Sequence, residues 1–270
     1  MAKRETVPVA LVTGASEGLG LALAKEFARA SHSLLLVART RSALMLAAND
    51  IRQANGVEVH IHVADLSTSE GCKSVELALE QYGLHAEFLV NNAGVGLSGP
   101  FVENGSDDLM RLVDLNMRAV TDLTRRLLPG MIARGSGGVL NVASLGGYLP
   151  GPYQAAYYAS KAYVISLSEA LAHEMAGTNV RVSVVVPGPV KTRFHERMGA
   201  QNDNYIRFMG LMSVEQVAQS AYVNFMRGRK VIVPGAVNMV SALFLRILPH
   251  TLLVPFAAWL LRRREGVGDA

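Results

Sequence analysis

The chain has 270 residues, of which 50% are hydrophobic and 18% are charged, and its formal net charge is +4. This composition excludes an intrinsically disordered chain, and the length suits one large α/β domain or two small ones. No basic stripe is interleaved with aromatic residues, so the small positive charge does not indicate a nucleic-acid-binding protein.

The only cysteine, Cys72, cannot form an intramolecular disulfide, and no group of Cys and His residues has the spacing of a metal site. The N-terminus passes from a few charged residues directly into an apolar run, which is not the pattern of a signal peptide. We therefore expect no metal and a reducing, cytoplasmic location.

The first apolar run, Val7 to Val12, predicts a buried strand, and a glycine-rich turn and a helical pattern follow it. Backbone N–H groups at such a turn can face a pyrophosphate, and glycines let the phosphates come close. The pattern predicts a dinucleotide site, although a plain strand-to-helix loop also fits it. The candidate residues are Gly14, Ser16, Glu17, Gly18, Leu19 and Gly20.

Ser33 to Ala38 predicts a second buried strand, and Arg39 follows it. At this position of a nucleotide-binding unit, an acid would bind the ribose 2′-hydroxyl and an arginine would suit a 2′-phosphate. Because no Asp or Glu stands there, the sequence favours NADP(H), with NAD(H) as the alternative. Two observations act against this preference: Arg39 also fits a solvated residue that opens a helix, and Glu17 would repel a phosphate.

Two further strands end in polar residues. Val57 to Val63 predicts a third strand, and Asp65 after it fits either a contact to adenine or a helix cap. Glu87 to Val90 predicts a fourth strand that runs into two asparagines, whose side-chain amides can tie neighbouring loops together. Asn116 lies among apolar residues of a helical pattern, so its amide needs a hydrogen-bond partner.

A fifth predicted strand, Gly138 to Ala143, delivers Ser144 at its carboxyl end. Tyr157 and Lys161 follow on a helix predicted over 155–176, and their spacing of four places them on one face. An ammonium beside a phenol lowers the pKa of the phenol, so the pair predicts an acid–base tyrosine.

Two more strands complete the pattern. The sixth, Val180 to Val186, leads into an irregular segment, 193–212, whose apolar residues suit a lid over a substrate: Met198, Tyr205, Phe208, Met209 and Met212. The seventh is Lys230 to Val233. Strands that alternate with helices predict a parallel sheet with helices on both faces.

From about Val7 to Pro234, these features resemble the short-chain dehydrogenase/reductase family. Each motif is weak alone, but six in the family's order and at family-like spacings are specific. The motifs are Thr13-Gly14-x3-Gly18-x-Gly20, Asn91-Asn92-Ala93-Gly94, Asn116, Ser144, Tyr157-x3-Lys161 and Pro187-Gly188. The resemblance implies a Rossmann-like, doubly wound parallel sheet of seven strands in the order 3-2-1-4-5-6-7.

The resemblance also implies roles. Tyr157 would be the general acid in reduction and the base in oxidation, Lys161 would lower its pKa and bind the nicotinamide ribose, and Ser144 would polarise the substrate carbonyl. Asn116 would hold a water that relays protons to Lys161. The further cofactor residues implied are Asp65, Leu66, Asn92, Ala93, Gly94, Tyr157, Lys161, Pro187, Gly188, Val190 and Thr192.

We expect residues 1–235 to form this single domain and 236–270 to form an apolar helical extension that packs on it or on a partner. Arg246, Pro249, His250 and Pro255 interrupt the apolar stretch, so two short helices with a break at Leu248-Pro249 are expected rather than a membrane span. The extension could cover a substrate pocket, seal a subunit interface or lie on a membrane.

The sequence thus predicts an NADP(H)-preferring oxidoreductase that interconverts a carbonyl and a secondary alcohol on an apolar substrate, such as a lipid-like, acyl or steroid-like molecule. A homodimer or homotetramer through the helix that carries Tyr157 is expected. The alternatives are a non-catalytic NADP(H) sensor or scaffold and a membrane-docked lipid-handling protein.

Overall fold

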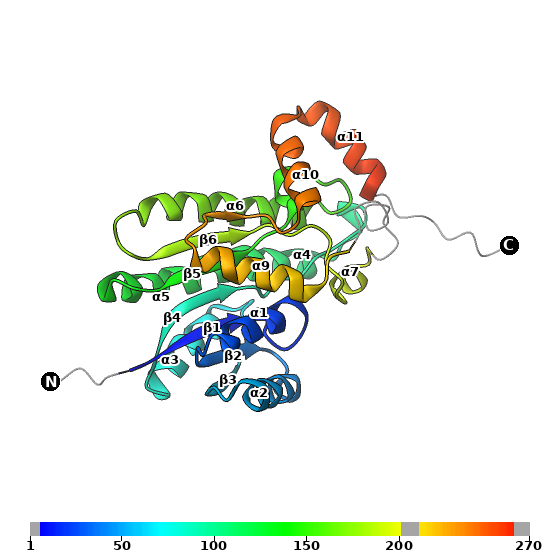
Figure 1. The fold of residues 1–270 in the computed structure, drawn as a ribbon. Coiled ribbons are helices and arrows are strands. Elements are labelled where there is room, and N and C mark those ends of the chain that lie inside the picture. Colours follow the sequence, from blue (N-terminus) through cyan, green and yellow to red (C-terminus); the bar gives the residue numbers. More distant parts are fainter. Residues whose placement is uncertain (1–5, 201–210, 262–270) are drawn as a thin grey trace.

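The computed structural model describes residues 6–200 and 211–261. Its centre is a parallel sheet of seven strands in the order β3-β2-β1-β4-β5-β6-β7 (Figure 1). The predicted sheet and its strand order are confirmed. The strands are β1 Val7–Thr13, β2 Leu34–Ala38, β3 Val59–Val63, β4 Leu84–Asn91, β5 Gly138–Val142, β6 Arg181–Val185 and β7 Val231–Ile232.

Strand β4 differs most from the expected bounds, because it begins at Leu84 rather than Glu87. Leu84 and Ala86 are buried, whereas His85 and Glu87 are only half-buried. The two polar residues interrupt the apolar run in the sequence, although their backbone continues the strand.

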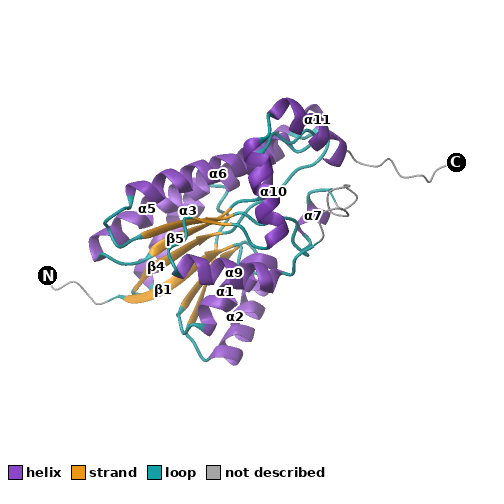
Figure 2. Ribbon diagram, turned by 45° about the horizontal axis from the view of Figure 1, so that its top comes forward, coloured by secondary structure: helices purple, strands orange, loops and turns teal. Residues whose placement is uncertain are grey.

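Helices cover both faces of the sheet, as the sequence predicts (Figure 2). Apolar side chains of α1, α2 and α9 pack on one face, and those of α3, α5 and α6 pack on the other. The helices are α1 Gly18–Arg29, α2 Arg41–Asn55, α3 Ser69–Gln81, α4 Ser106–Val113, α5 Ala119–Arg134, α6 Ala155–Glu174, α7 Phe194–Arg197, α9 Val214–Met226, α10 Ala236–Ile247 and α11 His250–Leu261.

Three local features differ from the expectations. The segment after β6 contains a short helix, α7, where an irregular loop is predicted. The N-cap of α3 is Thr68, whose hydroxyl accepts a hydrogen bond from the Gly71 N–H, so Asp65 is not the helix cap. A π-helical turn, Asp114–Arg118, separates α4 from α5 and carries Asn116.

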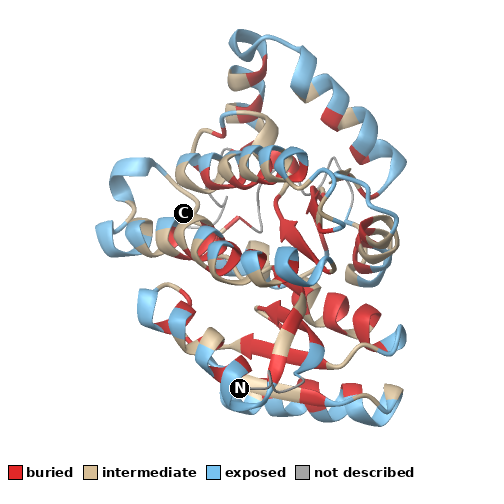
Figure 3. Ribbon diagram, turned by 90° about the vertical axis from the view of Figure 1, so that its left-hand side faces the viewer, coloured by how far each residue is buried: buried red, intermediate tan, exposed pale blue. Residues whose placement is uncertain are grey.

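The last two helices stand at one end of the molecule, beside α6 (Figure 1). Helix α10 ends at Ile247 and α11 begins at His250, on either side of the predicted break. The strands are largely buried, whereas much of the surface of these two helices is exposed (Figure 3). The division into a domain and an extension stays a prediction.

Candidate active site

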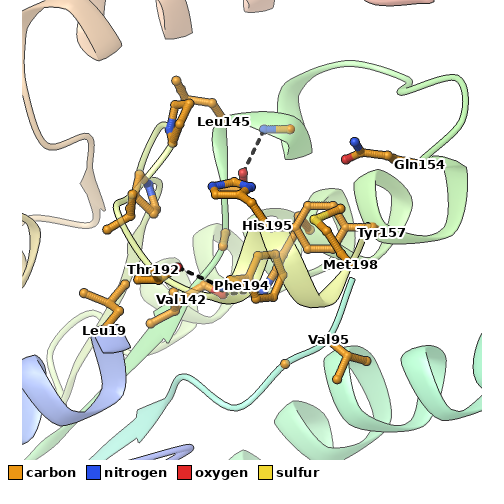
Figure 4. A pocket seen from close by; sticks show the side chains of 18 of the residues that line it. Leu19, Val95, Val142, Leu145, Gln154, Tyr157, Thr192, Phe194, His195 and Met198 are labelled. Atoms are coloured by element: carbon orange, nitrogen blue, oxygen red, sulfur yellow. Dashed lines mark hydrogen bonds between the residues drawn. The ribbon is translucent and has the colours of Figure 1, made fainter. Parts of the chain in front are cut away.

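A cavity of about 1370 Å³ opens at the carboxyl ends of the strands, next to the point between β1 and β4 where the strand order reverses. Every candidate site residue except Asn116 lines it. The cavity therefore brings together segments from the glycine loop to α11. Figure 4 shows part of its lining, from Leu19 in the glycine loop to Tyr157 on α6 and Phe194 on α7.

The glycine loop is held close to Asn92. Gly14 has a φ of 64°, and a Cβ built on it would lie 2.8 Å from the Asn92 Nδ2 atom. The same amide donates hydrogen bonds to the carbonyls of Thr13, at 3.0 Å, and Gly14, at 3.3 Å. Gly20 packs so tightly against Gly14 and Asn92 that any side chain there would collide with them. Only glycine fits these positions, and the start of α1 is left open to the cavity.

The two asparagines at the end of β4 have separate tasks. Asn92 ties the glycine loop, as described above. Asn91 is buried and donates to Thr124 Oγ1 on α5, at 3.2 Å, and to Asn141 Oδ1 on β5, at 2.9 Å. Asn91 therefore connects β4 to β5 and α5, and it does not tie loops together.

Arg39 is exposed at the end of β2 and lines the cavity beside Asp65. Burial alone would raise the pKa of Asp65, but hydrogen bonds from Ser67 and the charges of Arg111 and Arg39 hold it below its ordinary value. The Asp65 carboxylate also pairs with Arg111 at 3.1 Å. Arg39 keeps a position suited to a phosphate, because the nearby acid already has other partners.

Glu17 is the acidic residue of the glycine loop, and its charge is neutralised. Its carboxylate pairs with Arg193 at 2.9 Å and also with Arg197. The hydrogen bond from Arg197 lowers the pKa of Glu17, and the charges of both arginines act in the same direction. The expected repulsion of a phosphate is therefore weakened, and the glycine loop is joined to α7.

Ser144, Tyr157 and Lys161 lie together in the cavity. A side-chain hydrogen bond joins Ser144 and Tyr157, and the Ser144 hydroxyl also accepts from the Gly146 N–H at 3.1 Å. The Lys161 Nζ atom lies 5.8 Å from the centre of the Tyr157 ring and donates to the Val142 carbonyl at 3.0 Å. The spacing of four residues places the phenol and the amine on the same side of α6, as the sequence predicts.

The pKa values of Tyr157 and Lys161 differ from what the sequence predicts. Burial raises the pKa of Tyr157 to about 12, and the hydrogen bond with Ser144 opposes this rise. Burial lowers the pKa of the Lys161 amine from 10.5 to about 8. Burial disfavours the charged form of each group, and this effect exceeds the stabilisation of the phenolate by the nearby amine. Tyr157 is thus a protonated phenol at neutral pH.

Asn116 lies behind the cavity wall. Its Oδ1 accepts from the Val95 N–H at 2.9 Å, and its Nδ2 donates to the Val95 carbonyl at 2.8 Å and to Ser160 Oγ at 3.0 Å. A Cβ on Gly94 would lie 3.1 Å from Asn116 Oδ1 and 3.6 Å from Lys161 Nζ. The side chain of Asn116 therefore ties the loop after β4 to α6, and the predicted water relay stays a prediction.

The loop after β6 contacts both the glycine loop and α10. A Cβ on Gly18 would lie 3.6 Å from the Thr192 methyl group, and the Thr192 hydroxyl accepts from the Phe194 N–H at 3.2 Å. A Cβ on Gly188 would lie 2.8 Å from Asn238 Cγ on α10. Asn238 is buried and donates to the Pro234 carbonyl at 2.8 Å. Sequence reasoning missed Asn238, although a lone amide at the start of an apolar helix is a signal.

Aromatic and apolar side chains lie around Tyr157. The Phe194 ring centre lies 5.6 Å from that of Tyr157. Figure 4 shows Phe194, His195 and Met198 around the phenol. Of the predicted lid residues, Met198 and Met212 are described, whereas Tyr205, Phe208 and Met209 lie outside the described residues. Sequence reasoning did not identify the α10 and α11 residues in the wall, which are Ser241, Phe244, Leu245, Leu248, Leu252, Leu253, Phe256, Ala257, Trp259, Leu260 and Leu261.

A family model described as short chain dehydrogenase matches residues 8–203. The chain belongs to the short-chain dehydrogenase family. This short-chain dehydrogenase has a related solved structure, a short-chain dehydrogenase from Sphingobium yanoikuyae in complex with NADPH. The two are 33% identical and superpose with a TM-score of 0.78 over 85% of this chain and 89% of the other.

Two curated relatives of this short-chain dehydrogenase are named as reductases. The ketoacyl reductase HetN of Nostoc sp. is 36% identical over 180 residues, which cover 67% of this chain and 62% of the relative. The very-long-chain 3-oxoacyl-CoA reductase of Anas platyrhynchos is 35% identical over 189 residues, which cover 68% of this chain and 60% of the relative. The chain thus matches less than two thirds of the length of either relative.

Proposed function

We propose that this short-chain dehydrogenase is an NADP(H)-dependent oxidoreductase that reduces a carbonyl group of an apolar substrate to a secondary alcohol and catalyses the reverse reaction. The observation that carries the proposal is that the Tyr157 phenol is hydrogen-bonded to Ser144 and lies close to Lys161, in a cavity that the glycine loop also lines. Bound NADPH would supply the hydride.

The residues of the cavity fit this cofactor. Gly14 and Gly20 leave no room for side chains, so the backbone N–H groups at the start of α1 are open to a pyrophosphate. Arg39 suits the 2′-phosphate, and Asp65 and Leu66, which line the same cavity, would flank the adenine. The same cavity as Tyr157 is also lined by Ala93, Gly94, Pro187, Val190 and Thr192. The Sphingobium yanoikuyae relative, which holds NADPH, agrees with this preference.

In reduction, Tyr157 would act as the general acid. A phenol with a pKa of about 12 is protonated at neutral pH, so it can donate its proton to the carbonyl oxygen as that oxygen gains negative charge. The Ser144 hydroxyl would donate a second hydrogen bond to the same oxygen. Lys161, as an ammonium, would bind the ribose hydroxyls and stabilise the phenolate that remains after proton transfer.

The substrate class follows from the apolar part of the cavity wall. Phe194, Met198, Phe244, Leu248 and Phe256 make this wall apolar. We therefore propose an acyl, steroid-like or other lipid-like substrate rather than a sugar. The names of the two curated relatives, a ketoacyl reductase and a 3-oxoacyl-CoA reductase, agree with an acyl substrate. The predicted homodimer or homotetramer stays a prediction.

The test is reduction of a panel of apolar ketones and 3-oxoacyl thioesters with NADPH, followed by the absorbance of the reduced cofactor. Tyr157→Phe should lower kcat by about 10³-fold or more, because a general acid contributes about 10²–10⁴-fold. The dissociation constant of NADPH should change less than about threefold, since the ring remains.

Tyr163→Phe is the matched control. Tyr163 lies on the same helix and its hydroxyl bonds to Thr121 Oγ1 at 2.6 Å, outside the cavity, so this variant should keep its kcat. Comparable turnover by wild type and Tyr157→Phe would refute the assignment. NADPH binding by a wild type that reduces no panel substrate would favour the sensor or scaffold instead.

A further inference from the structure

Helix α10 presents an apolar face to solvent. Val237, Val240, Leu243 and Ile247 are exposed to 67%, 55%, 58% and 69%. Their spacing of three, three and four residues places them on one side of the helix. Asn238 and Ala242, on the opposite side, are buried against the domain. The usual orientation of an amphipathic surface helix is therefore inverted.

Helix α11 repeats this arrangement. Leu252, Phe256 and Trp259, spaced by four and three, are exposed to 65%, 54% and 53%, whereas Leu253, Ala257 and Leu261 are buried. Ten of the 22 large hydrophobic residues that are exposed in the described part of the chain lie between 237 and 259. Figure 3 shows both helices as largely exposed. A concentrated apolar surface of this kind marks a site of contact with a partner.

The sequence of this segment carries basic but no acidic residues. No Asp or Glu occurs from 236 to 261, where Arg246 is the only Lys or Arg. Arg246 lies over the Tyr148 ring and 3.9 Å from Glu169 of α6. Directly after α11 the sequence continues with Arg262, Arg263 and Arg264. Apolar faces with a tryptophan and adjacent arginines suit the interface of an anionic lipid bilayer.

The position of the surface argues against a second copy of this chain as the partner. Leu248, Leu252, Phe256 and Trp259 belong both to the exposed surface and to the cavity wall, so a second copy seated there would cover the cavity opening. None of the described helices is long and apolar enough to cross a bilayer.

We propose that α10 and α11 dock this protein on the surface of an anionic lipid bilayer, with the cavity opening against the lipid. An apolar substrate then enters the cavity from the bilayer rather than through water. The docking does not depend on the proposed reaction; only the delivery of substrate rests on it.

The experiment is co-sedimentation of the full chain with vesicles of phosphatidylcholine, with and without phosphatidylserine. Wild type should bind the vesicles that contain phosphatidylserine, and added salt should weaken the binding. The variant Val240→Glu/Leu243→Glu/Ile247→Glu should bind at least about tenfold more weakly, because its apolar face is lost. These three residues do not line the cavity, so NADPH binding and turnover of a short, water-soluble ketone should be unchanged.

The matched control is Leu46→Glu/Leu77→Glu/Ile132→Glu. It makes the same change of charge at hydrophobic residues exposed to 73%, 44% and 39% on other helices, and it should bind vesicles like wild type. Absence of wild-type binding, or equal loss in both variants, would overturn the proposal. It would also be overturned if the α10 variant only converted a dimer into a monomer. Vesicle binding by a protein that reduces no substrate supports the docking and counts against the reaction.

Discussion

Lys161 is a buried amine, and its burial lowers its pKa from 10.5 to about 8. Between these values the unfolded chain binds more protons at Lys161 than the folded one, so the contribution of Lys161 to stability should rise as the pH rises from 8 to 10.5. Below pH 8 the folded protein carries the full cost of a buried ammonium. The residue that the proposed chemistry needs therefore destabilises the fold at neutral pH.

Lys161→Met should accordingly raise the free energy of unfolding at pH 7 by about 1–3 kcal/mol, and the loss of the hydrogen bond to the Val142 carbonyl should offset part of this gain. The variant should also lose its activity. The part of the pH dependence of stability that Lys161 causes between pH 8 and 10 should vanish in this variant. Urea denaturation at pH 7 and pH 9.5 measures both effects. Lys73→Met, at an exposed position of α3, is the control and should show neither. A variant that is less stable than wild type at both pH values would contradict the argument.

Arg39 is the residue on which the cofactor preference depends. Arg39→Gln should raise the KM for NADPH about 10–100-fold, because a charge-assisted hydrogen bond contributes about 1.5–3 kcal/mol. The KM for NADH should change little, since NADH has no 2′-phosphate. Steady-state kinetics with both cofactors provide the measurement, and Arg41→Gln at the start of α2 is the control. An equal change of KM for the two cofactors would mean that Arg39 does not bind the 2′-phosphate.

At the scale of elements, the contact between Gly188 and Asn238 sets where α10 sits. A Cβ on Gly188 would lie 2.8 Å from Asn238 Cγ, so Gly188→Ala has to push α10 away from the loop after β6. We expect a loss of stability of about 1–3 kcal/mol and a raised KM for apolar substrates.

A double-mutant cycle tests this contact. Asn238→Ala removes the amide that Gly188 meets, at the cost of its hydrogen bond to the Pro234 carbonyl. Gly188→Ala/Asn238→Ala should be less destabilised than the sum of the two single variants, because the collision is absent. Thermal unfolding and substrate KM supply the data. Strict additivity would show that the two residues do not act on each other.

The link between Glu17 and α7 also belongs to this scale. Glu17 pairs with Arg193 and Arg197, so the loop that would bind the cofactor and the helix that covers Tyr157 are joined by ion pairs. These groups are well exposed, and each such pair contributes little to stability in water. Their effect is on position, because they hold Phe194 near the phenol.

On the scale of the whole molecule, α11 is a weakly held helix that carries a fluorescent side chain. It buries only Leu253, Ala257 and Leu261, and it carries the single tryptophan, Trp259. Elements with few buried contacts open at a lower free energy than the core. Trp259 fluorescence should therefore change at a urea midpoint roughly 0.5–1 M below that of the far-ultraviolet circular dichroism, which reports all helices. Coincident midpoints would instead mean that the extension and the domain unfold as one unit.

Much of the fold follows from local patterns. The strands and the pairing of Tyr157 with Lys161 were accessible because buried parallel strands read as apolar runs and because residues four apart share a helix face. The order of the strands came from the resemblance to the family. The glycine loop was accessible for a similar reason, since its constraint lies within a few residues of backbone. The bounds of β4 were not, because His85 and Glu87 interrupt its apolar run.

The sequence by itself determined the alternation of strands and helices in a parallel sheet and the residue types of the candidate site, because these depend on periodicity and on short-range spacing. The switch point followed from the strand order that the resemblance to the family implies. Only the tertiary structure decided that Glu17 is neutralised by α7, that burial raises rather than lowers the pKa of Tyr157, and that α10 and α11 complete the cavity while their apolar faces stay exposed. Each of these depends on segments far apart in the chain, and on how much water their contacts remove, which no local pattern encodes.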